Sequence, residues 1–250
     1  MTIRLLPSLA FALALWAAPP GAVAAPLRVL LLSGANNHDW RATTPVLKKI
    51  LEASGRFTVK VTTNVPALGP AAFAPYDAVL SNFNTFGEKN PGAVWPAEVR
   101  AAFVNYIRAG HGCVVVHAGS AGFYDWPEFQ QLAGATWGKG TSHGKLHTNE
   151  IQFSPQPHPI TAGLAPFSTF DEFWQHAQVA PGAQVLATVI PKKAFGGTGR
   201  PEPIAFATSL GAGRGFTLLL GHNVPAMTAA GFKTLLVRGT EWAATGRVAN

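Results

Sequence analysis

An apolar run meets a sharp polar turn in the stretch Cys113-Val114-Val115-Val116-His117-Ala118-Gly119-Ser120. Three of its first four side chains are β-branched, which is typical of a strand buried on both faces of a sheet. His117 is the first side chain after the run, and the following Gly119 and Ser120 are typical of a tight turn. Ligands of open parallel sheets bind outside the carboxyl ends of the strands. We therefore expect His117 to lie in a ligand site.

Apolar runs alternate with helical patterns in the first half of the chain. Leu27–Leu32, Phe57–Thr62 and Tyr76–Leu80 have the composition of strands. Stretches near Thr44–Ala53 and Pro96–Ala109 carry their apolar residues on one helical face. This alternation predicts a mostly parallel sheet covered by helices. Further on we expect a short helix, four strands and a final helix, over Trp126–Leu132, Glu150–Phe153, Val185–Val189, Ile204–Thr208, Phe216–Leu220 and Ala229–Ala244.

The N-terminus has the pattern of a secretory signal peptide. Arg4 precedes an apolar run, Leu5–Ala18, and the small residues Ala22-Val23-Ala24 follow Pro19 and Pro20. We expect cleavage after Ala24, with residues 25–250 forming a single domain in the periplasm or outside the cell. The apolar run is shorter than the roughly 20 residues that span a bilayer, and no second stretch is long enough.

The distribution of charge argues against a nucleic-acid-binding protein, and the cysteine content excludes a disulfide-bonded one. The formal net charge is +7, but lysines and arginines are scattered, whereas nucleic-acid binding requires a basic patch or stripe. Cys113 is the only cysteine, so no intrachain disulfide can form. Because Cys113 lies within an apolar run, we expect it to be a buried small hydrophobe and not a nucleophile.

Polar side chains follow four of the predicted strands. In a parallel sheet these ends meet at one edge, and the joins at the opposite edge hold few chemically active groups, so the pattern predicts a ligand site. For His117 the alternative is a hydrogen bond to a backbone carbonyl that holds the turn. The four pairs are His38 and Asp39, Asn82 and Asn84, His117 and Ser120, and His222 and Asn223.

Other polar residues lie in the predicted loops. His143 and His147 are four residues apart, but the nearby glycines argue against a helix and the glutamate of the HExxH metalloprotease motif is missing. They could be solvated, close over a site as a lid, or bind zinc. Asp171-Glu172 could orient His117 or act as a base, or Asp171 could cap a helix. His158 precedes Pro159 and is expected to lock a turn.

Together these motifs resemble the ThuA-like, trehalose-utilisation family over nearly the whole mature chain. The resemblance implies a fold like that of class I glutamine amidotransferases, a flavodoxin-like α/β three-layer sandwich with a mostly parallel central sheet. Those enzymes carry a nucleophilic cysteine at the elbow that here reads His117-Ala118-Gly119, so cysteine-dependent amide transfer is excluded. The motifs are His38-Asp39-Trp40, Val116-His117-Ala118, Phe123-Tyr124-Asp125-Trp126, Ser142-His143-Gly144, His158-Pro159-Ile160-Thr161, Asp171-Glu172, Gly221-His222 and 238–246.

The resemblance also implies a function in the use of trehalose and related disaccharides, through 3-keto sugars made by a partner sugar dehydrogenase. Our first hypothesis is an exported enzyme that isomerises, eliminates or hydrolyses a disaccharide or 3-keto-glycoside, with His117, Glu172 and His143 as catalytic residues. A divalent metal, zinc foremost, would be bound by His38, His117 and His222. Substrate-binding residues would be His38, Trp40, Asn82, Asn84, Asp171, His222 and Asn223.

Two rival hypotheses remain. The first is a non-catalytic carbohydrate-binding protein, which would use the aromatic rings and asparagines but no acid or base. Aromatic faces bind the apolar faces of sugars, although most aromatic residues simply pack in a core. The second is a scaffold protein with a decayed amidotransferase fold. A homo-oligomer is compatible with all three hypotheses.

Overall fold

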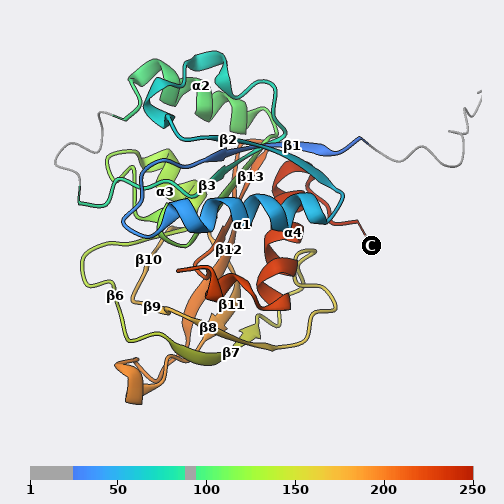
Figure 1. Cartoon of the computed structure of the whole chain (residues 1–250). Helices are drawn as coiled ribbons and strands as arrows, with labels where there is room; N and C mark the ends of the chain where they lie inside the picture. The colour runs from blue at the N-terminus through green and yellow to red at the C-terminus, as the bar shows by residue number, and fades with distance from the viewer. Residues whose placement is uncertain (1–24, 88–93, 250) are drawn as a thin grey trace, which may run out of the picture.

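A nine-stranded sheet crosses the molecule in the computed structural model, which describes residues 25–87 and 94–249 (Figure 1). The strand order is β2-β1-β3-β4-β13-β12-β11-β7-β8. The predicted signal peptide lies outside the described residues, as does most of the predicted loop 85–94. In sheet order the strands are Phe57–Thr62, Leu27–Leu32, Ala78–Ser81, Gly112–Val116, Gly213–Leu218, Glu202–Leu210, Gln184–Val189, His147–Phe153 and Phe167–Asp171.

The sheet is parallel in one half and antiparallel in the other. β2, β1, β3, β4 and β13 pair in parallel. β12, β11, β7 and β8 then continue as an antiparallel meander. Because β11 and β8 point the same way as the parallel half, seven of the nine strands share one direction. The expected mostly parallel sheet is confirmed, and its polar strand ends open on one edge.

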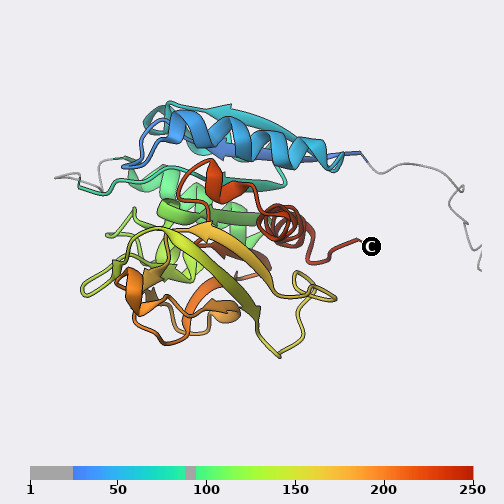
Figure 2. The same cartoon turned by 60° about the horizontal axis from the view of Figure 1, so that its bottom comes forward.

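Helices cover both faces of the parallel half. α1 (Trp40–Ala53) and α4 (Ala230–Thr245) lie on one face, and α2 (Ala97–Arg108) and α3 (Pro127–Ala133) lie on the other (Figures 1 and 2). Successive side chains of a strand point to opposite faces, so β4 contributes to both cores. Val114 and Val116 pack in the core with α1 and α4, while Cys113 and Val115 pack in the core with α2 and α3.

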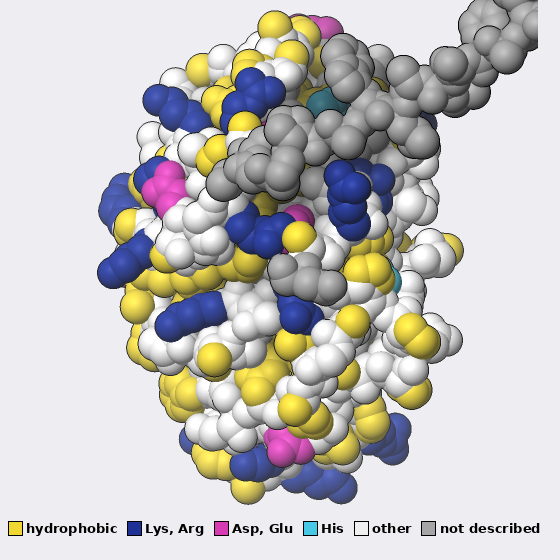
Figure 3. Space-filling model, turned by 90° about the vertical axis from the view of Figure 1, so that its right-hand side faces the viewer, with side chains coloured by type: hydrophobic (Ala, Val, Ile, Leu, Met, Phe, Trp, Pro, Cys, Tyr) yellow, Lys and Arg dark blue, Asp and Glu magenta, His cyan; other side chains and the backbone are white. Residues whose placement is uncertain are grey.

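Shorter elements complete the chain. Two small sheets join β10 (Gln178–Val179) to β5 (Ala135–Thr136) and β6 (Ser142–His143) to β9 (Trp174–Gln175). The 3₁₀ turns η1, η2, η4, η5 and η6 span Val65–Ala67, Pro70–Ala72, His117–Ser120, Lys193–Phe195 and Pro225–Met227. None of the described helices is long and apolar enough to cross a membrane. On the face shown in Figure 3, lysines and arginines outnumber acidic side chains, in keeping with the net charge of +7.

Two local predictions are wrong, and one alternative that the sequence left open is excluded. α1 begins at Trp40, four residues before the predicted start, because the Asp39 carboxylate accepts a hydrogen bond from the amide of Ala42 and caps the helix. His147 does not lie in a loop but begins β7, which pairs with β8. Asp171 caps no helix, because it is the last residue of β8. The last two outcomes share one cause: antiparallel pairing between distant segments overrides local composition.

Cys113 is buried, as expected. Its side chain is 1% exposed, and burial raises the pKa of its thiol to about 12. The thiolate that a nucleophile requires is therefore disfavoured at neutral pH.

Candidate functional site

The site is built on the elbow that follows β4. His117 has a φ of +45°, in the left-handed region that non-glycine residues rarely adopt. Gly119 is required here, because a Cβ atom would lie 2.5 Å from the carbonyl oxygen of Ser81. β4 lies between β3 and β13, so the elbow projects the imidazole of His117 into the middle of the sheet edge. Strained backbone of this kind is typical of functional sites.

Hydrogen bonding fixes the tautomer of His117. Its Nδ1 lies 2.7 Å from the carbonyl oxygen of Leu219, which can only accept, so Nδ1 carries the proton. Nε2 then presents a lone pair that is buried and has no hydrogen-bond partner among the described residues. Burial, reinforced by the nearby His38, lowers the pKa of His117 to about 3. The ring is therefore a neutral imidazole with a free, inward-facing nitrogen.

Glu172 is the acidic centre of the site. Its Oε2 lies 3.2 Å from His143 Nδ1 and 3.3 Å from His222 Nδ1, and its Oε1 lies 3.6 Å from His117 Nε2. Burial by itself would raise the pKa of this carboxyl, but His222 and the other two imidazoles outweigh burial and lower the pKa to about 2. The Glu172 carboxylate in turn raises the pKa of His222. Glu172 is thus a buried carboxylate surrounded by imidazoles.

Asn36 orients His38. The amide of Asn36 donates from Nδ2 to the carbonyl oxygen of Asn82, which leaves Oδ1 as an acceptor 3.2 Å from His38 Nδ1. His38 therefore carries its proton on Nδ1 and presents Nε2 to the site. Its ring centroid lies 5.0 Å from that of His117 and 4.5 Å from that of His222. Burial, followed by the effect of His222, lowers the pKa of His38 to about 4.

Four side chains form what we call the His-Glu cluster: His38, His117, Glu172 and His222. One ligand atom from each lies within 4.8 Å of all the others. Three imidazoles and a carboxylate are a donor set that zinc and other divalent transition metals accept. The buried lone pair of His117 Nε2 faces a carboxylate oxygen, and His222 Nδ1 also lacks a hydrogen-bond partner among the described residues. A cation between these atoms would satisfy them, so the residues fit a metal.

Asp171 supports the cluster from behind. Its carboxylate is fully buried and accepts hydrogen bonds from the backbone amides of Glu172, Gly221 and His222 at 2.8, 2.7 and 3.1 Å. Burial raises the pKa of Asp171 to about 7, although the three amide donors oppose the rise. Asp171 therefore joins the end of β8 to the turn after β13. It positions Glu172 and His222 relative to each other.

His143 is the exposed imidazole of the site. Its Nδ1 lies 2.9 Å from the carbonyl oxygen of Gly144, so this nitrogen carries the proton and Nε2 is free to accept one. The side chain is 43% exposed, whereas that of Glu172 is 5% exposed. β6 holds His143 opposite Trp174 of β9, whose ring centroid lies 5.5 Å from that of His117. A substrate could reach His143 without entering the core.

The structure brings five of the predicted site residues together: the His-Glu cluster and His143. Asn82 and Asn84 are buried and bind the threonines of α1 and the asparagines before His38. Asn223 accepts a hydrogen bond from the backbone amide of Ala226 in η6, and Trp40 lies beneath the guanidinium of its neighbour Arg41. These side chains and Asp171 make contacts with residues around the cluster. That they also bind a substrate stays a prediction.

Two other histidines have structural positions. His147 accepts a hydrogen bond at Nε2 from the amide of Lys192 and stacks on Phe195, with ring centroids 4.6 Å apart. His158 accepts a hydrogen bond at Nδ1 from the amide of Ile160 and packs against Trp242. The turn-locking position expected of His158 agrees with these contacts.

Sequence reasoning missed Asn36 and Trp174, whereas Trp137 was expected among the aromatic residues that flank the site loops. Asn36 lies two residues before His38, and a polar residue so close to a candidate ligand is a signal that could have found it. Trp174 is buried, its Nε1 has no hydrogen-bond partner among the described residues, and its ring centroid lies 5.0 Å from that of Trp137. Only pairing between β6 and β9 brings the ring of Trp174 to the site, so no local pattern marks it.

Comparison with known proteins identifies the family. The family model described as ThuA, trehalose utilisation, matches residues 28–243. A ThuA-like protein from Parabacteroides merdae is 30% identical, with a TM-score of 0.79 over 90% of this chain and 92% of its own. No curated protein matches the chain.

Two further solved structures share the fold at lower identity. A ThuA-like protein from Bacteroides uniformis is 20% identical, with a TM-score of 0.65 over 90% of this chain and 95% of its own. A cytoplasmic protein from Salmonella typhimurium is 10% identical, with a TM-score of 0.61 over 87% of this chain and 99% of its own. The expected α/β sandwich, of the type found in class I glutamine amidotransferases, is confirmed. The chain belongs to the ThuA family, whose role lies in trehalose utilisation and carbohydrate metabolism.

Proposed function

We propose that this protein is an exported, metal-dependent enzyme that acts on a disaccharide or 3-keto-glycoside by acid–base chemistry. The observation that carries the proposal is the His-Glu cluster, in which two buried imidazole nitrogens without hydrogen-bond partners among the described residues lie beside a buried carboxylate. A sugar-binding protein needs no such cluster, because sugars are held by amides, hydroxyls and aromatic faces.

His38, His117, Glu172 and His222 would hold the metal, with zinc the first candidate. A divalent ion bound there supplies a Lewis acid that polarises a carbonyl oxygen. Metal-bound histidines usually donate a hydrogen bond from the ring nitrogen that does not bind the metal. Two of the proposed ligands already do so, because the carbonyl oxygen of Leu219 and Oδ1 of Asn36 accept hydrogen bonds from Nδ1 of His117 and His38. These contacts fix both rings with Nε2 directed inward.

His143 would act as the general base that transfers a proton of the substrate. Its side chain is partly exposed at the edge of the cluster, Nε2 carries no proton, and Nδ1 is held between the carbonyl oxygen of Gly144 and Glu172. In a 3-keto-glycoside the hydrogen on C2 is acidic because it lies beside the carbonyl. His143 would remove this proton, the bond from C1 to the glycosidic oxygen would break, and the departing oxygen would take the proton back from the imidazolium.

Aromatic side chains would hold the sugar ring. Trp137 lies beside His143, with ring centroids 5.9 Å apart, and packs edge-to-face against Phe86 at 6.2 Å. Phe86 is 44% exposed, so its ring is accessible to a ligand. A substrate whose apolar face covers these rings would place its reacting carbons near His143. A sugar dehydrogenase acting earlier would supply the keto group.

The experiment combines metal analysis with turnover. Elemental analysis of the purified mature chain should find a divalent metal at one per chain, and the loaded protein should cleave or isomerise 3-keto-trehalose faster than trehalose. His143→Ala should retain the metal and lose at least about 100-fold in turnover, the range of a general base. Glu172→Gln should lose both the bound metal and turnover. His176→Asn, at an exposed histidine outside the cluster, is the matched control and should change neither.

The same experiment separates the rival functions. Saturable sugar binding by the metal-loaded protein without turnover, retained when His117 and Glu172 are both replaced, would establish a carbohydrate-binding protein. Absence of both metal and sugar binding would reject the enzyme and leave the scaffold hypothesis.

A further inference from the structure

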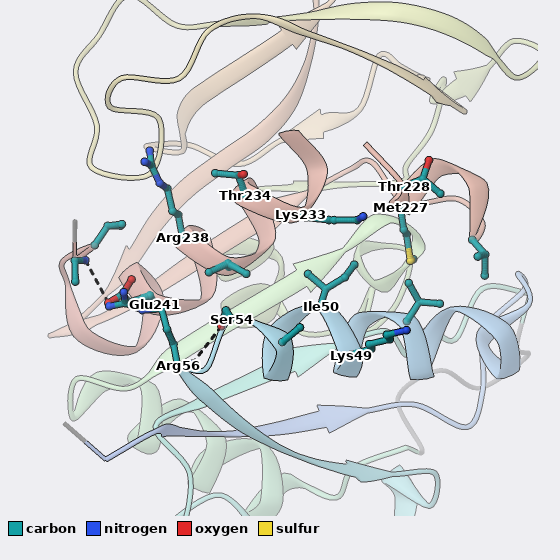
Figure 4. A pocket seen from close by; sticks show the side chains of 16 residues that line it. Lys49, Ile50, Ser54, Arg56, Met227, Thr228, Lys233, Thr234, Arg238 and Glu241 are labelled. Atoms are coloured by element: carbon teal, nitrogen blue, oxygen red, sulfur yellow. Dashed lines mark hydrogen bonds and ion pairs between the residues drawn. The ribbon is translucent and has the colours of Figure 1, made fainter. Parts of the chain in front are cut away.

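A cleft of about 630 Å³ opens between α1 and α4 (Figure 4). No member of the His-Glu cluster lines this cleft. Its walls are apolar: Val46 and Ile50 come from α1, Met227 from η6, Val237 from α4 and Val248 from the C-terminal segment. Small-molecule sites commonly have volumes of roughly 300–1,000 Å³ and apolar walls with a few charged groups. The cleft has the size and lining of such a site.

Two lysines at one end of the cleft have no counter-charge. Figure 4 shows Lys49 on α1 and Lys233 on α4 on opposite walls, at the end nearest Met227. Both side chains are exposed, and neither has a hydrogen-bond or ion-pair partner within residues 25–87 and 94–249. Two unpaired ammonium groups above apolar walls favour a ligand with one anionic end.

The other charged groups of the cleft already have hydrogen-bond or ion-pair partners. Arg56 forms an ion pair with Glu241 at the opposite end of the cleft. Arg238 donates to the carbonyl oxygens of Ile160 and Ala162. Among the described residues, Lys49 and Lys233 are therefore the cationic groups of the cleft whose donors are free, and Val46, Ile50 and Val237 supply apolar wall beside them.

We propose that this cleft binds a soluble organic acid that has a single carboxylate and an unbranched apolar chain. The carboxylate contacts the ammonium groups of Lys49 and Lys233, and the chain lies along Ile50, Met227 and Val237. A second copy of this chain is disfavoured as the occupant, because a two-fold contact of this face with itself would bury Lys49 and Lys233 while Glu241, the acidic residue of the cleft, is already paired with Arg56. A nucleic acid is disfavoured because its phosphates need a basic stripe, whereas the cleft is mainly apolar.

Calorimetric titration of the purified mature chain with decanoate tests the proposal. We expect saturable binding at one decanoate per chain, and no comparable binding of 1-decanol, which lacks the charge. The double variant Lys49→Glu/Lys233→Glu should weaken decanoate binding at least about tenfold, because it replaces attraction by repulsion at the carboxylate. Val237→Trp should abolish binding by filling the apolar part of the cleft.

Lys139→Glu/Lys193→Glu is the matched control. It changes the net charge equally at two exposed lysines that do not line the cleft, and it should bind decanoate as the parent does. Circular dichroism and melting temperature verify that each variant folds. Absence of saturable binding, equal weakening by the control pair, or equal binding of 1-decanol would overturn the proposal. Co-sedimentation with phosphatidylglycerol vesicles that requires Lys49 and Lys233 would overturn it too, since a bilayer lipid would then be the ligand.

Discussion

Single hydrogen-bond acceptors outside the His-Glu cluster orient two of its imidazoles, those of His117 and His38. The backbone carbonyl oxygen of Leu219 and the side-chain amide oxygen of Asn36 each accept a hydrogen bond from an Nδ1–H group, which leaves Nε2 of His117 and of His38 without a hydrogen. Asn36 is itself held by Asn84, which donates to the same oxygen at 3.0 Å. The orientation of His38 thus depends on an amide network that no local sequence motif describes.

We predict that Asn36→Ala weakens zinc binding by about 10- to 100-fold, the usual effect of removing a group that orients a metal ligand. The reason is that His38 loses the acceptor for its Nδ1 proton and can rotate. Isothermal titration with zinc is the measurement. Asn37→Ala is the control, since the side chain of Asn37 also accepts a hydrogen bond from Asn84, whereas the ring of His38 is bonded to Asn36. Equal losses in both variants would show that the loop, and not the orientation of His38, matters.

Among the helices, α4 approaches the sheet closely at a glycine. Gly239 faces the ring of Phe216 in β13, and a Cβ atom at Gly239 would overlap that ring. Both residues are buried, and Phe216 belongs to the core that α4 covers. The close packing of α4 on the sheet is possible because Gly239 has no side chain. The position of α4, which forms one wall of the cleft between α1 and α4, depends on this glycine.

Gly239→Ala should lower the free energy of unfolding by about 1–3 kcal/mol, the usual cost of overpacking a core. Chemical denaturation at constant temperature measures the change. Gly69→Ala is the matched substitution, because a Cβ atom at Gly69 meets nothing within 4 Å and its φ of −94° suits alanine. It should leave stability unchanged or slightly higher. A Gly239→Ala variant as stable as the parent would mean that α4 shifts without cost.

A second helix contact predicts a dependence of stability on pH. His158 packs on Trp242 of α4, accepts from the amide of Ile160, and has a pKa lowered from 6.5 by burial. Between pH 6.5 and the lower folded pKa, the unfolded chain binds the proton and the folded chain does not. Stability therefore falls as the pH drops through this window.

His158→Gln should make the loss of stability smaller as the pH drops below 6.5. Urea denaturation at several pH values measures it, with His176→Asn as the control at an exposed histidine. An unchanged pH dependence in His158→Gln would show that this imidazole is protonated as readily in the folded protein as in the unfolded chain.

Across the whole molecule, the His-Glu cluster joins segments that are far apart in the sequence. His38 follows β1, His117 follows β4, Glu172 follows β8 and His222 follows β13. These strands lie in both halves of the sheet, so a metal bound to the cluster would link the parallel half to the antiparallel meander. Binding that requires the folded arrangement stabilises the folded state.

Zinc should therefore raise the melting temperature. At a free zinc concentration about a hundred times Kd, the added stability is about 2.7 kcal/mol, which corresponds to roughly 5 to 10 °C for a chain of this size. Thermal unfolding with zinc and with a chelator measures the shift. Glu172→Gln should lose most of the shift, and His176→Asn should keep it. A shift that survives in Glu172→Gln would place the zinc elsewhere.

The parallel half of the sheet was predictable because its strands are apolar on both faces. The run Cys113–Val116 contributes to both cores, and such a run has few other stable arrangements in water. The convergence of His38, His117 and His222 was also predictable, because parallel strands end at one edge. β6 and β9 were not, since two-residue strands leave no periodic pattern and form only by pairing with each other.

By itself, the amino-acid sequence determined the α/β class, the buried cysteine, the ThuA resemblance and the residues that gather at the sheet edge, because these follow from local polarity and from strand direction. Only the tertiary structure decided that Asp171 supports the site instead of capping a helix, that Asn36 orients His38, and that Lys49 and Lys233 face each other across a cleft. Each of these depends on contacts between segments separated by many residues, and the geometry of such contacts is set by packing of the whole chain.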